Sequence, residues 1–473
     1  MSRAHRSPEL CSRAALAALA LAGTVGLSGC GQTGAPARTP PPDLVLVSLD
    51  TFRADLLELA RADGSAELPT LRRLAEESIS FVNAWSPQPF TLPSHMTMMT
   101  GLHPESHGVA SREERLAAEV PTLAEHLHAA GYRTLGVACG PWLAPRFGFA
   151  RGFDYYKDLG MALTFAKRVR GRTRRALAEH GAGEAPLFLF AHFYDAHGDW
   201  GGEGNHLSYY SPPHERRDFE LPERVLCGGD GAERECAIRF LMKNADHPPL
   251  PANEFAALHF ELYRRGARAL DAELAGFFDE LRRSGIWDDA VIVVTADHGE
   301  EFGEHGQFVH TQIFRETLRV PLLVKLPRAE RGGTRVTRPV ALEDIAPTLL
   351  ARAGVAVPAA LQGFDLLSPP RTGAERPLVA RASSRRQRYG LRLGSRFLVR
   401  DPSAGELRLF DLTADPEERH EIPAGAEERR SLEERLDAAL RRLRAERHVA
   451  LRQPASALDA RESAELRALG YLD

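Results

Sequence analysis

The sequence predicts an α/β fold: a mainly parallel central sheet with helices on both faces, followed by a small C-terminal antiparallel sheet and a terminal helix. Two observations predict it. Short apolar runs, each followed by polar or glycine residues and then by a helical pattern, recur through the first three quarters of the chain, an order typical of parallel strands joined by helices. From about Arg371 the segments become shorter and more polar, which indicates a second, smaller unit.

The predicted strands and helices alternate within a large unit at residues 43–370. The strands are 44–49, 134–138, 187–191, 291–296 and 320–325. Segments 69–79, 121–130 and 255–283 alternate apolar and charged residues at helical spacing, and we expect them to cover the faces of the sheet.

The C-terminal unit, residues 371–473, is predicted to hold antiparallel strands and one helix. Segments 389–400 and 406–412 are expected to be strands joined by the turn 401–405. After Pro423 comes a charged amphipathic helix that carries Leu432, Leu436, Leu440 and Leu443 on one face. We expect this stripe to dock onto the body of the protein, with a partner helix as the alternative.

Composition and charge exclude several classes of protein. The chain has 473 residues and 43% hydrophobic content, as an ordinary globular protein does, and it is neither disordered nor fibrous. A formal net charge of -4 gives no general electrostatic reason to bind nucleic acid. The locally basic run 168–175 is expected to be a solvated helix face, with a binding patch as the alternative.

The first thirty residues are predicted to be a targeting segment. A basic start leads into the apolar run 14–27, which is too short to span a bilayer permanently. Residues 27–30, Leu-Ser-Gly-Cys, resemble the lipobox of bacterial lipoproteins, which implies cleavage before Cys30 and acylation of its thiol. A plain secretory signal is the alternative. We therefore expect export to the periplasm or cell envelope, with a membrane anchor at Cys30 and a flexible tether over residues 31–42.

The other cysteines give weaker indications. Cys227 and Cys236 are close enough in sequence for a loop disulfide in an oxidising compartment, but sequence spacing does not settle the pairing. Cys139 follows an apolar run and is expected to be a buried core residue.

Metal-ligating side chains stand at the ends of three predicted strands. Asp50 follows the first strand, His192, Asp195 and His197 follow the third, and Asp297 and His298 follow the fourth. Ligands of open α/β sheets bind at the carboxyl ends of the strands. One acidic residue there is usually a helix cap, whereas three strand ends that supply carboxylates and imidazoles favour a divalent-metal site.

A threonine is predicted at the start of a helix. Thr91 stands before Pro93, which suits a first helical turn, and Gly101 closes the helix. An alkoxide or an anionic phosphoryl or sulfuryl group is stabilised there by free backbone N–H groups and the helix dipole. An alcohol still needs a metal to lower its pKa, as zinc lowers that of water from about 15.7 to about 7. A role for Thr91 as a mere helix cap is the equal alternative.

An ordered set of motifs closely resembles the sulfatase family of the alkaline-phosphatase superfamily, from about Asp43 to the C-terminus. The set comprises Asp50; Thr91, Pro93 and Ser94 with Thr100 and Gly101; Pro104, His107 and Gly108; and the segments 152–154, 192–197, 297–300, 303–306, 319–322, 409–412 and 415–418. A set in this order is more specific than any one motif.

The chain departs from the family pattern at the position of the catalytic formylglycine. Sulfatases make that aldehyde from Cys or, in some bacteria, Ser, whereas Thr91 stands here and threonine cannot be converted. His95 replaces the motif arginine, Thr51 the second aspartate and His310 the usual lysine. These changes resemble the threonine-nucleophile branches, such as nucleotide pyrophosphatases and lipid-A phosphoethanolamine transferases, which bind zinc and form a phosphothreonine.

The resemblance implies a role for each matching residue. Asp50, Thr91, Asp297 and His298 would surround the principal metal. His197 and His310 would contact the transferring group, protonate the leaving oxygen or help to hold a second metal. The resemblance thus implies one or two divalent ions, zinc first, with calcium or manganese as alternatives. Two zinc ions would suit a phosphate dianion better than a sulfate monoanion.

Four further residues in matching motifs keep open roles. His95, His107 and His305 would either contact the site or order their loops. Glu300 would orient His298 or begin a helix.

The leading hypothesis is a metal-dependent hydrolase that cleaves phosphate monoesters or diesters, or sulfate esters, through Thr91 and a covalent intermediate. The expected substrate is an anionic ester in a small molecule, glycan or lipid. The alternatives are sulfate ester hydrolysis without formylglycine, transfer of the group to an alcohol, and a surface lipoprotein that binds anionic glycans or phospholipids without catalysis. No membrane span is evident after residue 30, which favours hydrolysis over transfer. The insertion 206–251, expected to form a lid or rim, does not indicate the substrate.

Overall fold

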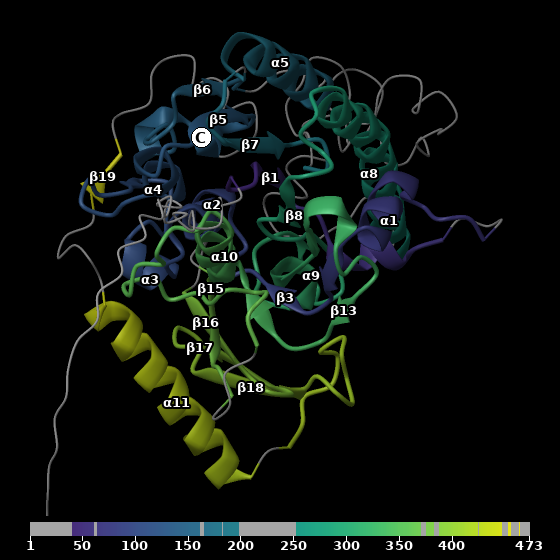
Figure 1. The fold of residues 1–473 in the computed structure, drawn as a ribbon. Helices are drawn as coiled ribbons and strands as arrows, with labels where there is room; N and C mark the ends of the chain where they lie inside the picture. Colours follow the sequence, from purple (N-terminus) through teal and green to yellow (C-terminus); the bar gives the residue numbers. More distant parts are fainter. Residues whose placement is uncertain are drawn as a thin grey trace, which may run out of the picture. The chain divides into compact units, whose positions relative to one another are not determined.

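The computed structural model describes residues 40–60, 64–160, 165–181, 183–197, 252–369, 375–382, 387–423, 425–446, 453–455 and 463 (Figure 1). They belong to the compact unit Pro41–Asp473. The predicted signal segment, residues 31–39 of the tether, Cys227, Cys236 and the insertion 206–251 lie outside the described residues. None of the helices in the described ranges has the length and apolar character needed to cross a membrane.

The large unit is built on an eight-stranded, mainly parallel sheet. Its strands, in spatial order, are β13 (Arg335–Val336), β2 (Ile79–Phe81), β12 (Leu322–Lys325), β8 (Val291–Ala296), β1 (Leu44–Leu49), β7 (Leu187–Phe193), β5 (Arg133–Ala138) and β6 (Tyr155–Asp158). The three central strands are buried apolar runs, as strands covered on both faces must be. The predicted fold class is confirmed.

The register of the central strands aligns their carboxyl ends. β1 pairs in parallel with β7 and β8, and Leu49, the last residue of β1, lies opposite Phe193 and Ala296. Asp50 and Asp297, the next residues of β1 and β8, therefore leave the sheet side by side.

Two groups of helices cover the sheet on either side of the row of strands (Figure 1). The first group is α1 (Pro69–Glu76), α5 (Phe165–His180) and α8 (Ala252–Arg283), and the second is α2 (Thr91–Thr100), α4 (Leu123–Ala129) and α10 (Ile345–Arg352). The short helical elements of the large unit are α3 (Pro104–His107), α9 (Arg315–Leu318) and the 3₁₀ turns η1 (Ala54–Glu58), η2 (Pro141–Leu143), η3 (Pro145–Phe147), η4 (Pro327–Ala329) and η5 (Leu342–Asp344). On α5 the basic residues Arg168, Arg174 and Arg175 are exposed, and Cys139 is buried directly after β5.

Two predicted elements are wrong in detail. The predicted strand 320–325 is broken at Pro321, because proline cannot donate to a ladder. Its first part, β11 (Arg319–Val320), joins β3 (Ala84–Trp85) and β14 (Val340–Ala341) in a separate sheet, and β12 runs antiparallel to β8. The predicted helix 69–79 ends at Glu76, and Ile79 begins β2.

The C-terminal unit contains a four-stranded antiparallel sheet. Its strands are β15 (Leu378–Ala382), β16 (Arg388–Leu393), β17 (Arg396–Asp401) and β18 (Glu406–Asp411). The predicted single strand 389–400 is thus a hairpin, turned at Gly394 with φ 58°. Two small pairs complete the described strands: β9 (Glu301–Phe302) with β10 (Phe308–Val309), and β4 (Glu114–Arg115) with β19 (Gln453–Pro454).

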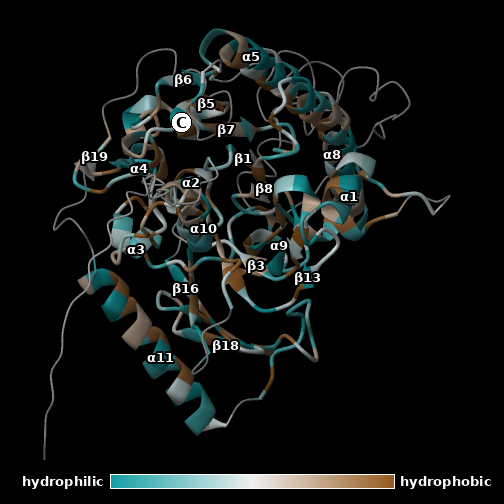
Figure 2. Cartoon of the chain, in the orientation of Figure 1, coloured by the Kyte–Doolittle hydropathy of each residue, from teal (hydrophilic) through white to brown (hydrophobic). Residues whose placement is uncertain are grey.

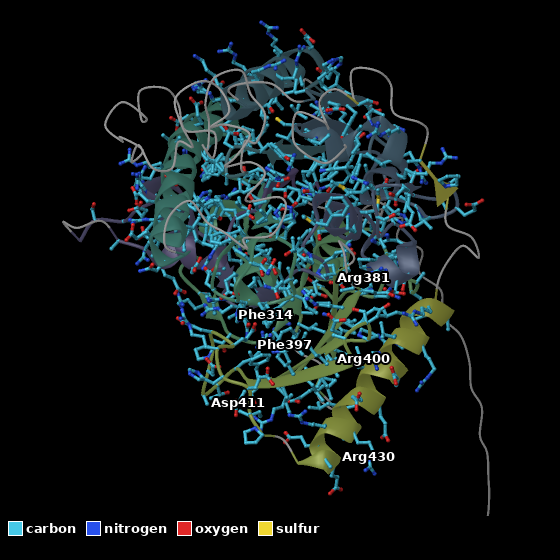
Figure 3. All side chains as sticks on the ribbon, turned by 180° about the vertical axis from the view of Figure 1, so that it is seen from behind. Phe314, Arg381, Phe397, Arg400, Asp411 and Arg430 are labelled. Carbon is cyan, nitrogen blue, oxygen red and sulfur yellow. The ribbon has the colours of Figure 1, made fainter. Side chains whose placement is uncertain are left out.

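The last described helix, α11 (Ala426–Ala445), lies along the C-terminal sheet. It carries hydrophilic and hydrophobic residues in alternating bands (Figure 2). The hydrophobic stripe is buried against Leu391, Leu398 and Leu409 of the sheet, so the helix docks onto its own chain. Phe314 and Phe397, labelled in Figure 3, belong to the separate apolar cluster that joins this sheet to the large unit.

Candidate active site

Asp50, Asp297 and His298 come together at the carboxyl ends of β1 and β8. One ligand atom from each lies within 4.8 Å of the others, and all three residues are buried. Thr91 is the first residue of α2, and its Oγ1 lies 3.5 Å from Nε2 of His298. The structure therefore places in one buried centre the four residues that the sequence predicts around the principal metal.

The side chain of Thr91 does not cap its helix. The residue at the N-cap position of α2 is Phe90, whose backbone is extended, and the helix has no side-chain cap. The hydroxyl of Thr91 instead faces the carboxylates and His298. Gly101 ends the helix in the left-handed conformation, with φ 67°, as predicted.

The hydrogen bonding of His298 leaves one ring nitrogen open to a cation. Its Nδ1 lies 2.9 Å from the carbonyl oxygen of Gly299, and because a carbonyl only accepts, Nδ1 carries the hydrogen. In the neutral ring Nε2 then holds a lone pair, and this atom lies 3.4 Å from Oδ2 of Asp297. A neutral imidazole held in this way is a typical metal ligand.

The expected partnership of Glu300 with His298 is wrong. Glu300 Oε1 lies 3.2 Å from Nδ1 of His310, and the carbonyl of Gly299 orients His298 instead. No helix begins there either, because β9 starts at Glu301. The backbone of Gly299 is closely packed: an added Cβ would lie 1.9 Å from the carbonyl oxygen of Glu316, so only glycine fits after His298.

Each of the two carboxylates keeps one oxygen without a hydrogen-bond partner. Oδ1 of Asp297 accepts from the backbone N–H groups of Thr51, at 3.1 Å, and His298, at 2.9 Å. Oδ2 of Asp50 lies 3.1 Å from Nε2 of His192. The remaining oxygens, Asp297 Oδ2 and Asp50 Oδ1, have no partner among the described residues. Because buried polar atoms are normally paired, two such oxygens beside an imidazole lone pair fit a divalent cation.

The pKa shifts of the two carboxyl groups also fit a divalent cation at the centre. Burial, and next the charge of Asp297, raise the pKa of Asp50 well above its usual value. Burial also acts to raise the pKa of Asp297, but the adjacent imidazole of His298 and the hydrogen bond from the backbone N–H of Thr51 act against it, and that pKa is lowered. A bound cation would relieve the repulsion between the two carboxylates.

His95 orders the first turn of α2 and carries no charge. Its Nδ1 donates to the carbonyl oxygen of Thr91 at 2.9 Å, and its Nε2 accepts from Ser48 Oγ at 2.8 Å. Burial lowers the pKa of His95 to about 3 and that of His192 to about 4. His95 therefore supports the nucleophile helix and does not supply the positive charge of an arginine.

Comparison with known proteins identifies the family. The sulfatase family model matches residues 42–355, which is most of the large unit. The chain belongs to the sulfatase family. An ulvan-active sulfatase from Formosa agariphila is 25% identical over 440 residues, covering 86% of this chain and 81% of the relative.

Solved structures confirm the fold. A protein in complex with its substrate D-glucosamine-2-N,6-O-disulfate superposes with a TM-score of 0.65 at 18% identity, over 86% of this chain and 98% of the other. The phosphonate monoester hydrolase of Silicibacter pomeroyi superposes with a TM-score of 0.64 at 19% identity, over 85% and 95%. This sulfatase-family chain is accordingly a hydrolase, and sulfatases generally use a divalent metal, for which the Asp50 centre offers ligands.

Two further histidines of this sulfatase-family protein lie next to the centre. The ring of His310 lies 4.5 Å from that of His298, and the ring of His197 lies 5.6 Å from that of His310 and stacks on Tyr194. Within the described residues, the groups of three metal-ligating side chains include neither His197 nor His310.

Strained backbone flanks both sides of the centre. Thr51 and Val309 are β-branched, yet they adopt φ 52° and 78°, in the left-handed region that such residues avoid. Thr51 thereby turns its N–H onto Asp297, and Val309 directly precedes His310. Tyr263 holds the first strained loop, because its hydroxyl donates to the Thr51 carbonyl and accepts from the N–H of Arg53. No sequence signal marked Tyr263, which lies in the middle of α8.

His107 and Asp195, from the matching motifs, are hydrogen-bonded to residues other than the four of the centre. His107 is hydrogen-bonded to Thr97 Oγ1 and to the backbone N–H of Val109, so it orders the turn after α2. Asp195 Oδ1 accepts from the N–H of Ala166 at the start of α5, a capping role. His305 lies in a separate cluster, described below.

Proposed function

We propose that this protein hydrolyses monoanionic sulfate or phosphate esters, with Thr91 as the nucleophile and one divalent cation at Asp50, Asp297 and His298. The observation that carries the proposal is the position of the Thr91 hydroxyl, buried beside two carboxylates with unpartnered oxygens. The cation would lower the pKa of the neighbouring hydroxyl and balance charge on the ester oxygens. Zinc suits the nitrogen and oxygen ligands best, with manganese or calcium as alternatives.

The chain's own residues then account for each bond that changes. Oγ1 of Thr91 gives up its proton to solvent and forms a bond to phosphorus or sulfur while the bond from that atom to the leaving oxygen breaks, which gives a threonine ester. The leaving oxygen takes a proton from His310 or His197, and Glu300 orients His310 for this task. A water molecule then attacks the same phosphorus or sulfur atom and gives a proton back to the histidine, while the bond to the Thr91 oxygen breaks and that oxygen takes up a proton from solvent.

Charge balance favours a substrate with one negative charge. The described residues offer one three-ligand group at this centre, not two, and burial keeps His95 and His192 neutral. One divalent cation offsets the two carboxylates, so a monoanionic ester leaves one uncompensated negative charge in the buried centre and a phosphate monoester dianion leaves two. Sulfate esters, phosphodiesters and phosphonate monoesters each bring one. The relatives named above include an ulvan-active sulfatase and, by fold, a phosphonate monoester hydrolase.

Export and lipid anchoring also belong to the proposal. The basic start, the apolar run and the Leu-Ser-Gly-Cys motif at residues 27–30 support a mature protein held in the cell envelope by Cys30. Intact mass of the membrane fraction tests this, because acylation adds the mass of fatty acids to a chain that begins at Cys30. Release of a Cys30→Ala variant into the soluble fraction is the expected counterpart.

A substrate panel with matched variants tests the proposed chemistry. Protein lacking residues 1–30 is loaded with zinc and assayed on aryl sulfates, phosphodiesters, phosphonate monoesters and phosphate monoesters. We expect Thr91→Val to lower kcat by about a thousandfold or more with the fold unchanged. Thr100→Val removes another buried hydroxyl from the same helix and should keep activity. Normal turnover by Thr91→Val would exclude Thr91 as the nucleophile, and binding without turnover would favour the non-catalytic alternative. Product transfer to added alcohols would indicate a transferase.

A further inference from the structure

A second group of metal-ligating side chains lies where the C-terminal unit meets the large unit. His305 follows β9, Glu316 lies in α9, and Glu418 comes from the segment after β18. One ligand atom from each of these three residues lies within 4.8 Å of the others. Phe314, labelled in Figure 3, marks the boundary: it stacks on His305 at 3.8 Å and packs edge-on against Phe410 of β18 at 6.0 Å.

The ligand atoms of this group are buried and unpartnered. His305 Nε2, Glu316 Oε2 and Glu418 Oε1 all lack a hydrogen-bond partner among the described residues. Glu418 is 0% exposed and Glu316 is 6% exposed. The other oxygen of Glu418 accepts from the backbone N–H of Arg315 at 3.0 Å, which fixes the carboxylate with Oε1 directed at the other two residues. Three buried polar atoms that make no hydrogen bond at one point are costly unless something binds there.

The surrounding charge is suited to a cation. Burial, and next the charge of Glu316, raise the pKa of Glu418 well above its usual value. Glu301, also buried, has a pKa raised by burial and then by Glu316 and other acids nearby. Arg315 and Arg392 lower the pKa of Glu418 through space, yet neither side chain is within ion-pair distance of its carboxylate among the described contacts.

The distance between two of the ligand atoms is compatible with a shared zinc ion. His305 Nε2 lies 3.4 Å from Glu316 Oε2. Zinc bound to nitrogen and oxygen at about 2.0–2.2 Å holds adjacent ligands about 3.3–3.6 Å apart. The backbone of Glu418 has a φ of 55°, in the left-handed region that non-glycine residues avoid. Such strain is typical of ligand-binding positions.

We propose that His305, Glu316 and Glu418 bind a second divalent cation, zinc by ligand type, which fastens the C-terminal unit to the large unit. The site is separate from the Asp50 centre, and its role is structural. It also ties down the loop between β9 and β10, which leads to His310. Loss of the cation should therefore loosen the boundary between the two units without removing any residue from the active site.

Zinc content in matched variants tests the proposal. The background is Asp50→Asn with Asp297→Asn, which removes both carboxylate ligands of the active-site centre. After equilibration with zinc and dialysis, elemental analysis should find one zinc per chain in this background and none after adding Glu418→Gln. Glu417→Gln, at the neighbouring exposed residue, is the control and should keep the zinc. In the wild-type background Glu418→Gln should remove one zinc ion whether or not the active-site centre also binds one, so the two proposals fail separately.

Two readouts guard against a variant that fails to fold. Circular dichroism checks each protein, and Glu316→Gln and His305→Gln repeat the test at the other ligands. Cobalt(II) bound to the Asp50→Asn, Asp297→Asn protein should give the strong visible absorption of a tetrahedral site, lost in each of these variants. A folded background protein that binds neither zinc nor cobalt, or a Glu418→Gln protein with unchanged zinc content, would overturn the proposal.

Discussion

The substitution Asp50→Asn should have opposite effects on two quantities: the stability of the metal-free protein and the affinity of the protein for zinc. In the metal-free protein the Asp50 carboxyl is destabilising, because it is fully buried and its ligand oxygen lies within 4.8 Å of that of Asp297. Two full charges at that distance repel by about 3 kcal/mol at an effective dielectric constant of about 20. Asn has the same shape without the charge, and its amide can donate to His192 Nε2 as a protonated Asp50 would. The metal-free variant should thus be as stable as wild type or up to about 3 kcal/mol more stable.

Zinc should reverse this order. Loss of a carboxylate ligand should weaken zinc binding by about 100-fold or more, since even residues that only orient ligands are worth about 10–100-fold. At a zinc concentration of about 100 times the wild-type Kd, the gain in unfolding free energy is about 2.7 kcal/mol for wild type, and it should fall to about 0.4 kcal/mol in Asp50→Asn.

Urea unfolding in chelator and in zinc measures both effects. Both proteins keep His305, Glu316 and Glu418, so any zinc bound there contributes equally and cancels from the comparison. A variant that loses the same stability in chelator and in zinc would show that Asp50 acts only through its hydrogen bond. An undiminished zinc increment would show that Asp50 is not a ligand.

Three other substitutions test the packing and the buried acids. Gly299→Ala should abolish activity and lower Tm, because the added Cβ would lie 1.9 Å from a backbone oxygen. The control Gly171→Ala, whose Cβ would have nothing within 4 Å, should stabilise α5 by roughly 0.5–1 kcal/mol. Equal effects of the two substitutions on activity would contradict the close packing at Gly299. Leu436→Ala should lower the unfolding free energy by about 2–5 kcal/mol, because Leu436 is fully buried. Arg435→Ala, at the exposed neighbouring residue, should change it by about 0.5 kcal/mol or less. A near-neutral Leu436→Ala would mean that the hydrophobic stripe of α11 does not stabilise the protein. Burial raises the pKa of Glu343 to about 7, so the folded state holds a proton that the unfolded state releases, and stability falls as pH rises from about 4.5 through about 7. Glu343→Gln should reduce the loss of stability between pH 5 and pH 8, measured by urea midpoints, and an unchanged pH dependence would contradict the burial of that acid.

The elements that the sequence predicts well are those set by local pattern. The buried central strands are continuous apolar runs, so their ends at Leu49 and Ala296 were predictable, and with them the positions of Asp50 and Asp297. Thr91 was placed at a helix start by Pro93 and Gly101. The predicted single strand 320–325 failed at Pro321, and the antiparallel direction of β12 depends on which neighbour it pairs with, which the local sequence does not record.

The supporting contacts of the site could not be predicted, because they join residues far apart in the chain. Tyr263 reaches the Thr51 loop from the middle of α8, and Ser48 contacts His95 from inside β1. Glu300 was expected at His298 because the two are only two residues apart in sequence, but the fold turns its carboxylate to His310. His305 matched a motif of the active site, yet it faces the C-terminal unit.

The central claim is that the Thr91 oxygen itself becomes bonded to the transferred group. Zinc-loaded protein is mixed with its best substrate, quenched in acid within one turnover, digested and analysed by mass spectrometry. The peptide that contains Thr91 should carry the added mass of a phosphoryl or sulfuryl group, with fragmentation locating it on Thr91, and Thr91→Val should carry none. Rapid turnover with an unmodified Thr91 peptide at every quench time, or an adduct on another residue, would contradict the mechanism.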